Sequence, residues 1–211
     1  MNAAVGKTAS RRAGFTLVEL LAVVAVVSAV AALLLPALGQ AREKSRVAAC
    51  VGNLRQLGQA AFVYCDDWGA LPTAHYSSGY LLWNGTDYLL YAQMLPRGGS
   101  SLAKSFYCPS ARTFAMADRT TGLRHLGVPG QVTAGTYYER GQLQGGPLTL
   151  NREVQALMAD LYQDPVNVRN HSGGINVLYS DGSVRFVSLA ASWKFSQGGA
   201  WTQLDNGVAA P

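Results

Sequence analysis

The chain has 211 residues, a formal net charge of +5 and only 14% charged residues, a length that allows one domain and an appendage. Its basic residues are scattered rather than gathered into a dense stripe, so the charge does not favour nucleic acid as a partner. Three cysteines exclude a fully paired disulfide framework, and their spacing matches no known zinc motif.

The N-terminal part of the chain contains a long apolar run, residues 15–35, whose one charge is Glu19. As a helix these residues span about 30 Å, the thickness of the hydrocarbon core of a membrane. The positive-inside rule places the N-terminus in the cytoplasm, because three basic residues precede the run: Lys7, Arg11 and Arg12. Three more basic residues follow it and weaken this orientation: Arg42, Lys44 and Arg46. We expect a single pass through the inner membrane, with the following domain periplasmic or extracellular.

Three kinds of targeting segment compete for this run. It is too long for a conventional cleaved signal peptide, and no small-x-small cleavage site follows it. A plain signal anchor leaves Glu19 unexplained, because a carboxylate in hydrocarbon is expensive and marks a functional residue by default. The third kind is a prepilin leader.

The segment GFTLVELL, residues 14–21, resembles the type IV prepilin signature, as do the short basic leader, residues 1–14, and Pro36 near the end of the run. The resemblance implies that prepilin peptidase cleaves between Gly14 and Phe15 and that Phe15 becomes N-methylated. After cleavage, Glu19 lies one helical turn from the Phe15 ammonium. It either neutralises that charge in part within one subunit or meets Phe15 of a neighbouring subunit, where a buried pair fixes register. The alternative is a carboxylate near the membrane interface that snorkels or stays protonated.

Residues 36–66 predict an amphipathic continuation of this helix, kinked or broken near Pro36 and Gly39. Apolar residues recur there at helical spacing, and stop signals follow at Asp66, Gly69 and Pro72. The rest of the chain, residues 67–211, is expected to form a small soluble domain.

The segment INVLYSDGSVRFVS, residues 175–188, predicts a β-hairpin with Asp181-Gly182 as a two-residue turn. That turn pairs Tyr179 with Val184 and gives the hairpin one apolar face, which we expect to pack on the long helix. Nine residues separate His171 from Asp181-Gly182. With the N-terminal motif, this spacing resembles a family of prepilin-processed proteins named for an H-X9-DG element. The resemblance implies a pilin-like α+β fold, related in outline to type II secretion pseudopilins, and brings no catalytic residues.

His171 is interpreted as a structural residue at the base of the hairpin, like Asp181 and Gly182 in the turn. The alternative is a metal or acid/base set with three aspartates: Asp160, Asp164 and Asp181. Calcium bound through aspartate oxygens is the better of these functional options. We expect no metal, no cofactor and no catalytic residue, and we predict a disulfide between Cys50 and Cys108.

The sequence thus predicts a non-enzymatic structural subunit, a pseudopilin or minor pilin of a type II secretion-like or type IV pilus-like filament. Its expected partners are prepilin peptidase, other pilin subunits and the inner membrane, and no nucleic acid. The first alternative is a membrane-tethered binding module. The second is a tethered hydrolase that uses His171 with Asp160 or Asp181.

Overall fold

The computed structural model describes residues 14–72, 81–95, 102–111, 123–140, 154–160, 171, 173–188 and 200–205. The chain divides into two compact units, Met1–Arg42 and Glu43–Pro211. Most of the predicted leader, residues 1–13, lies outside the described residues.

The dominant element is α1, a helix of 52 residues over Leu17–Trp68. It runs without interruption through Pro36 and Gly39, so the alternative of two helices broken there is wrong. The helix ends where Gly69 takes a positive φ of 72° and donates its N–H to the Cys65 carbonyl at 2.8 Å. Glycine serves this end because it has no Cβ to resist the left-handed conformation.

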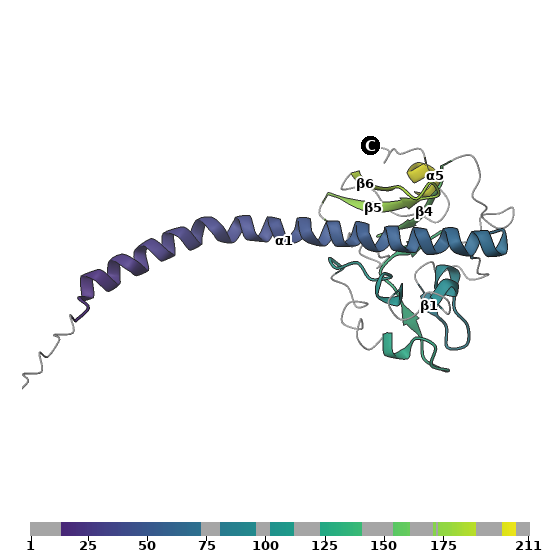
Figure 1. The fold of residues 1–211 in the computed structure, drawn as a ribbon, viewed down its shortest axis with the longest axis horizontal. Coiled ribbons are helices and arrows are strands. Elements are labelled where there is room, and N and C mark those ends of the chain that lie inside the picture. The colour runs from purple at the N-terminus through teal and green to yellow at the C-terminus, as the bar shows by residue number, and fades with distance from the viewer. Residues whose placement is uncertain are drawn as a thin grey trace, which may run out of the picture. The chain divides into compact units, whose positions relative to one another are not determined.

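The second unit is built around the C-terminal part of α1. This part buries one stripe of side chains at helical spacing: Cys50, Leu54, Leu57, Gly58 and Ala61. Figure 1 shows it running between the strands of two small antiparallel sheets. The stripe belongs to one core, which also takes in buried residues of β1, β4 and β5.

The smaller sheet pairs β1, Leu81–Trp83, with β2, Thr133–Ala134. A short 3-10 helix, η1, follows β1 over Leu90–Met94. The larger sheet has the order β3-β4-β5-β6, with every neighbouring pair antiparallel. Its strands and the helix α5 that lies against β4 have these bounds: β3 Tyr138–Glu139, β4 Ala156–Ala159, β5 Gly174–Tyr179, β6 Val184–Ser188 and α5 Ala200–Asp205. This arrangement confirms the predicted α+β class.

Alternate residues of β5 enter two different cores. Leu178 belongs to the core shared with α1, and its side chain lies directly against Gly58. Ile175, Val177 and Tyr179 belong to the other core, with Trp201 and Leu204 of α5. The prediction that this apolar face packs on the long helix is therefore wrong: all six residues of β5 are buried because both faces of the strand are covered.

The hairpin register also differs from the prediction by one residue. Leu178, not Tyr179, pairs with Val184. The backbone N–H of Tyr179 donates to the Ser183 carbonyl at 2.9 Å, and the Tyr179 carbonyl accepts from the Gly182 N–H at 2.9 Å. The chain thus turns through Ser180 and Asp181, and Gly182 takes the positive-φ bulge position of a three-residue loop, at φ 79°.

Replacing Gly182 with valine should destabilise the protein by about 1–3 kcal/mol, because a β-branched residue resists that positive φ. A Cβ at this position would also lie 2.9 Å from the Phe62 ring. The measurement is the melting temperature of the full chain in detergent, monitored by circular dichroism. An unchanged melting temperature would contradict this account of the turn.

Candidate functional site

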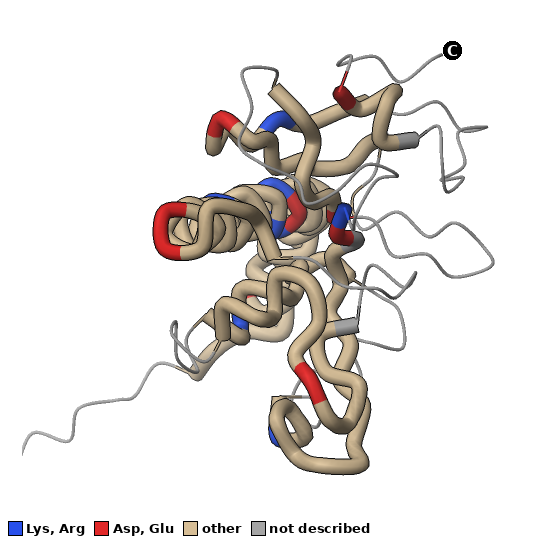
Figure 2. Tube along the Cα trace, turned by 90° about the vertical axis from the view of Figure 1, so that its right-hand side faces the viewer, with Lys and Arg blue, Asp and Glu red and all other residues tan. Residues whose placement is uncertain are grey.

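Two parts of the chain carry candidate functional side chains: the start of α1 and a buried group in the second unit. Basic and acidic positions are otherwise interspersed along the described chain rather than gathered in one band (Figure 2).

The N-terminal part of α1 presents its apolar side chains to the outside. Phe15 is 71% exposed and Leu33 is 78% exposed, and the large apolar residues between them are also exposed. Within the described residues, α1 is the one helix long and apolar enough to cross a membrane. Such a surface is costly in water and is normally covered by lipid or by other helices.

Glu19 caps the start of this helix. Its Oε2 accepts from the Thr16 backbone N–H at 2.9 Å and from the Thr16 hydroxyl at 2.7 Å. Thr16 Oγ1 in turn accepts from the Glu19 N–H at 3.3 Å. This is a capping box, which satisfies backbone donors that the first helical turn leaves without partners. The sequence T-L-V-E carries the signal for it, which our sequence analysis did not use. In this unprocessed chain Phe15 has a peptide nitrogen, so the predicted pairing of Glu19 with its ammonium stays a prediction.

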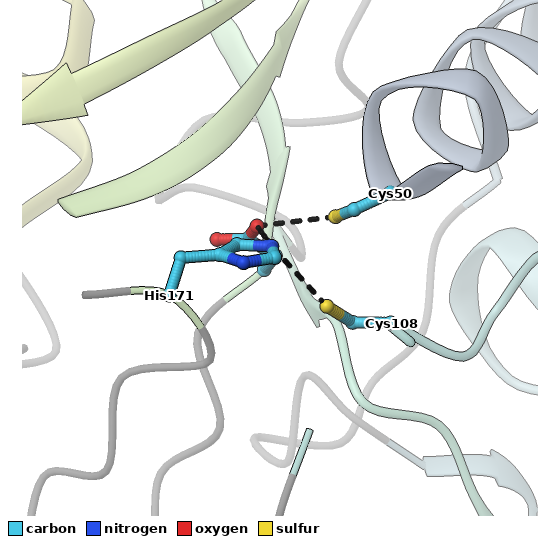
Figure 3. Close-up of side chains that lie close together, drawn as sticks. Cys50, Cys108 and His171 are labelled. Carbon is cyan, nitrogen blue, oxygen red and sulfur yellow. Dashed lines mark hydrogen bonds and ion pairs between the residues drawn. The ribbon is translucent and has the colours of Figure 1, made fainter. Parts of the chain in front are cut away.

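The second group lies inside the Glu43–Pro211 unit and consists of Cys50, Cys108, Asp160 and His171, here called the CCDH cluster. Four segments supply it: the middle of α1, the turn after residues 102–104, the residue that follows β4, and the residue bridged to the start of β5. All four residues are at most 2% exposed. Figure 3 shows the two cysteines and the histidine converging on one point.

The ligand atoms of the CCDH cluster all lie within 4.8 Å of one another. The Cys50 thiol donates to Asp160 Oδ2 at 3.1 Å. His171 Nε2 lies 3.1 Å from the same oxygen and 3.4 Å from Cys108 Sγ. Two sulfurs, one ring nitrogen and one carboxylate oxygen therefore face a common centre.

A second layer of hydrogen bonds orients these side chains. Glu43 lies two helical turns before Cys50, and its Oε1 is 2.9 Å from His171 Nδ1. The Ser110 hydroxyl donates to the same oxygen at 3.0 Å. Asn176 donates its backbone N–H to Asp160 Oδ1 at 2.7 Å and its side-chain amide to Oδ2 at 2.8 Å. Tyr137 donates its hydroxyl to Cys50 Sγ at 3.4 Å. Each of Cys50, Asp160 and His171 is thus held in one orientation by its own partner.

Burial and charge oppose each other in the cluster. Burial lowers the pKa of His171, but the hydrogen bond and charge of Asp160, with further bonds to Cys50 and Glu43, outweigh it and raise that pKa to about 10. Burial raises the pKa of Asp160, against the hydrogen bond and charge of His171. Burial also raises the pKa of the Cys50 thiol, so that thiol keeps its proton unless a cation replaces it.

The structure separates the residues that the sequence analysis grouped around His171. Asp160 contacts His171, as the acid/base alternative requires, but both are buried away from solvent. Asp181 lies in the exposed turn, where its carboxylate accepts from Ser183 and pairs with Arg185 at 3.1 Å. Asp164 lies outside the described residues.

Three further residues lie around His171 that the sequence analysis did not group with it: Cys50, Cys108 and Glu43. Cys50 and Cys108, predicted as a disulfide, are close together but are free thiols in this structure. Glu43 was missed altogether, because nothing in its local sequence signals a partner 128 residues away.

Two protein families match parts of the chain. Residues 9–35 match the family described as "Prokaryotic N-terminal methylation motif", and residues 39–101 match one described as "Protein of unknown function (DUF1559)". No curated protein and no solved structure matches the chain significantly. The first match indicates a prepilin-type N-terminus, the kind that prepilin peptidase processes. Together with the second match and the apolar start of α1, it supports a pilin-like protein with a membrane anchor. The matches end at residue 101, so the H-X9-DG resemblance stays a prediction.

Proposed function

We propose that the chain is a structural subunit, a pseudopilin or minor pilin, which assembles through the N-terminal part of α1 into a type II secretion-like or type IV pilus-like filament. The observation that carries this proposal is the exposed apolar N-terminal part of α1, which has a single carboxylate, Glu19, in its first turn. A helix that only anchors a domain needs no charge there, because an uncharged acceptor can also cap its first turn and a carboxylate is expensive in lipid. A helix that packs against copies of itself gains a partner for it.

In the proposed filament, Glu19 meets the methylated Phe15 ammonium of a neighbouring subunit. A subunit displaced along the bundle leaves both charges in an apolar core without partners, so the pair selects one register even where it adds little stability. The capping box supports this role, because it fixes the carboxylate beside the helix N-terminus where an incoming ammonium would lie.

Two other functions make different predictions. A membrane-tethered binding module shares the processing and the anchor but stays monomeric. A tethered hydrolase needs substrate to reach His171, and that side chain is 1% exposed. Burial of His171 and Asp160 therefore favours the structural subunit over the hydrolase.

The proposal is tested by crosslinking in intact cells that contain an active prepilin peptidase and assembly ATPase. We expect ladders of crosslinked multimers and sheared filaments that contain the chain. A chain that is processed and membrane-bound but runs only as a monomer would support the tethered module instead.

The mature chain should begin at N-methylated Phe15, and mass spectrometry of the N-terminal peptide measures this directly. Replacing Gly14 with alanine should slow or block processing. The protein itself offers no steric obstacle there, since nothing lies within 4 Å of a Cβ at Gly14, so the effect would arise inside the peptidase. An intact Met1 N-terminus in a host with active peptidase would contradict the motif.

A further inference from the structure

We propose that the CCDH cluster is a zinc site, with Cys50, Cys108, Asp160 and His171 as its four ligands. The sequence analysis expected no metal because no two of these residues have a metal-motif spacing along the chain. The fold supplies the proximity that the sequence lacks, since each ligand comes from a different segment.

The donor set selects the metal. Thiolate sulfur and imidazole nitrogen are ligands for zinc, whereas calcium prefers oxygen, and here only one of four ligand atoms is an oxygen. The calcium alternative of the sequence analysis therefore does not fit this cluster. All four positions come from buried side chains, which is the closed coordination of a structural zinc site rather than the open one of a catalytic site.

The separations of the ligand atoms are close to those of tetrahedral coordination, and all lie within 4.8 Å. Zinc–sulfur bonds of about 2.3 Å and zinc–nitrogen or zinc–oxygen bonds of about 2.0–2.1 Å place ligand atoms about 3.3 to 3.8 Å apart. The cluster has 3.1 Å between Cys50 Sγ and Asp160 Oδ2, 3.1 Å between Asp160 Oδ2 and His171 Nε2, and 3.4 Å between His171 Nε2 and Cys108 Sγ. An ion would require these three pairs to move apart by a few tenths of an ångström, and any pair wider than the tetrahedral range to close.

The second layer has the form that zinc sites use. A zinc-bound histidine donates its other ring N–H to a carboxylate, which fixes the tautomer and the ring orientation. Glu43 stands in that position, 2.9 Å from His171 Nδ1, and leaves Nε2 to face the two sulfurs and Asp160. Asn176 holds the Asp160 carboxylate by two hydrogen bonds in the same way. These residues orient the ligands and are positioning residues, not ligands themselves.

Binding replaces two thiol protons and the proton on His171 Nε2 by one divalent cation, and those protons leave to solvent. The bound ion would join the middle of α1 to the ends of β4 and β5 and to the turn that carries Cys108. This inference concerns the second unit alone and stands whether or not the chain forms filaments.

The test uses the full chain in detergent, reduced and freed of metal with a chelator, then titrated with cobalt(II) as an optical substitute for zinc. We expect saturation at one ion per chain, thiolate-to-cobalt charge-transfer absorption and the d–d bands of a tetrahedral site. Zinc should displace the cobalt, and elemental analysis of the chain purified without chelator should find zinc.

Variants separate the ligands from the other residues. Cys108→Ser and His171→Ala should lose the charge-transfer band or bind much more weakly. Cys65→Ser is the matched control, a free cysteine outside the cluster, and should bind as the wild type does. Glu43→Gln should keep the stoichiometry and the spectrum but weaken affinity about 10- to 100-fold, as changes of such outer partners do.

The wild-type titration does not depend on whether any variant folds. No cobalt spectrum from the reduced wild-type chain would overturn the site and leave the cluster as a buried ion network. A Cys50–Cys108 disulfide in chain purified from its native compartment would overturn it equally, in favour of the predicted bridge.

Discussion

Filament assembly is expected to fail when Glu19 is replaced by valine, while membrane insertion and processing continue. Insertion should be unchanged or improved, because the substitution removes the one charge of the apolar run. Cleavage should persist, since the scissile bond between Gly14 and Phe15 is not altered. The measurement compares crosslinked ladders and sheared filaments with a blot of the membrane fraction. Normal polymers from the valine variant would refute the assembly role and favour a tethered module.

The capping box gives this experiment two matched controls. Glu19→Gln keeps an acceptor for the Thr16 N–H but not the charge, so it should assemble nearly as poorly as valine. Thr16→Val removes the capping hydroxyl and leaves the charge, so it should assemble, with a helix start weakened by about 1 kcal/mol. The opposite order, with Gln normal and Thr16→Val defective, would show that Glu19 acts as a cap rather than as a charge.

The second large effect is expected from Gly174→Ala, at the first residue of β5. A Cβ there would overlap the Val187 carbonyl oxygen and the Phe186 ring, both on the paired strand β6. A backbone carbonyl cannot change rotamer as a flexible side chain can, so β5 and β6 must separate locally. We expect destabilisation of about 3 kcal/mol, the upper end of the usual cost of overpacking. Thermal unfolding of the full chain in detergent measures it.

Gly52→Ala is the control for this substitution. Gly52 lies inside α1, and nothing is within 4 Å of a Cβ there. Alanine should therefore stabilise the helix by about 0.5–1 kcal/mol. The same chemical change is thus expected to have opposite signs at the two sites, and equal effects would contradict the packing described for β5 and β6.

The long helix and the hairpin could be predicted because their signals are local. The spacing of Leu54, Leu57 and Ala61 fixes one face of a helix, and Gly69 ends it. The hairpin register could not be predicted, because Ser-Asp-Gly suits either a two-residue turn or a three-residue loop with Gly182 at the positive φ. Packing decides between them, and packing is not local.

The CCDH cluster could not be predicted for the same reason. Cys50 alone resembles any buried helical cysteine, and Asp160 resembles any residue that ends a strand. Their contact joins positions 110 residues apart, so only the tertiary fold makes them neighbours. Sequence reasoning considered Asp160 as a partner of His171 and paired Cys50 with Cys108, but it had no means of joining the two pairs into one group.

The sequence separation of these contacts also determines when the domain can fold. A chain emerges from the ribosome N-terminus first, so the buried stripe of α1 is made long before the strands that cover it. Leu178, which packs against Gly58, and His171, which contacts Glu43, belong to the last quarter of the chain. Closing such long loops is slow, because their entropy is lost before the contacts form. During most of synthesis, the apolar stripe of α1 is therefore not yet covered by β5, and chaperones and proteases can bind it. A chain that stops before β5 should be degraded.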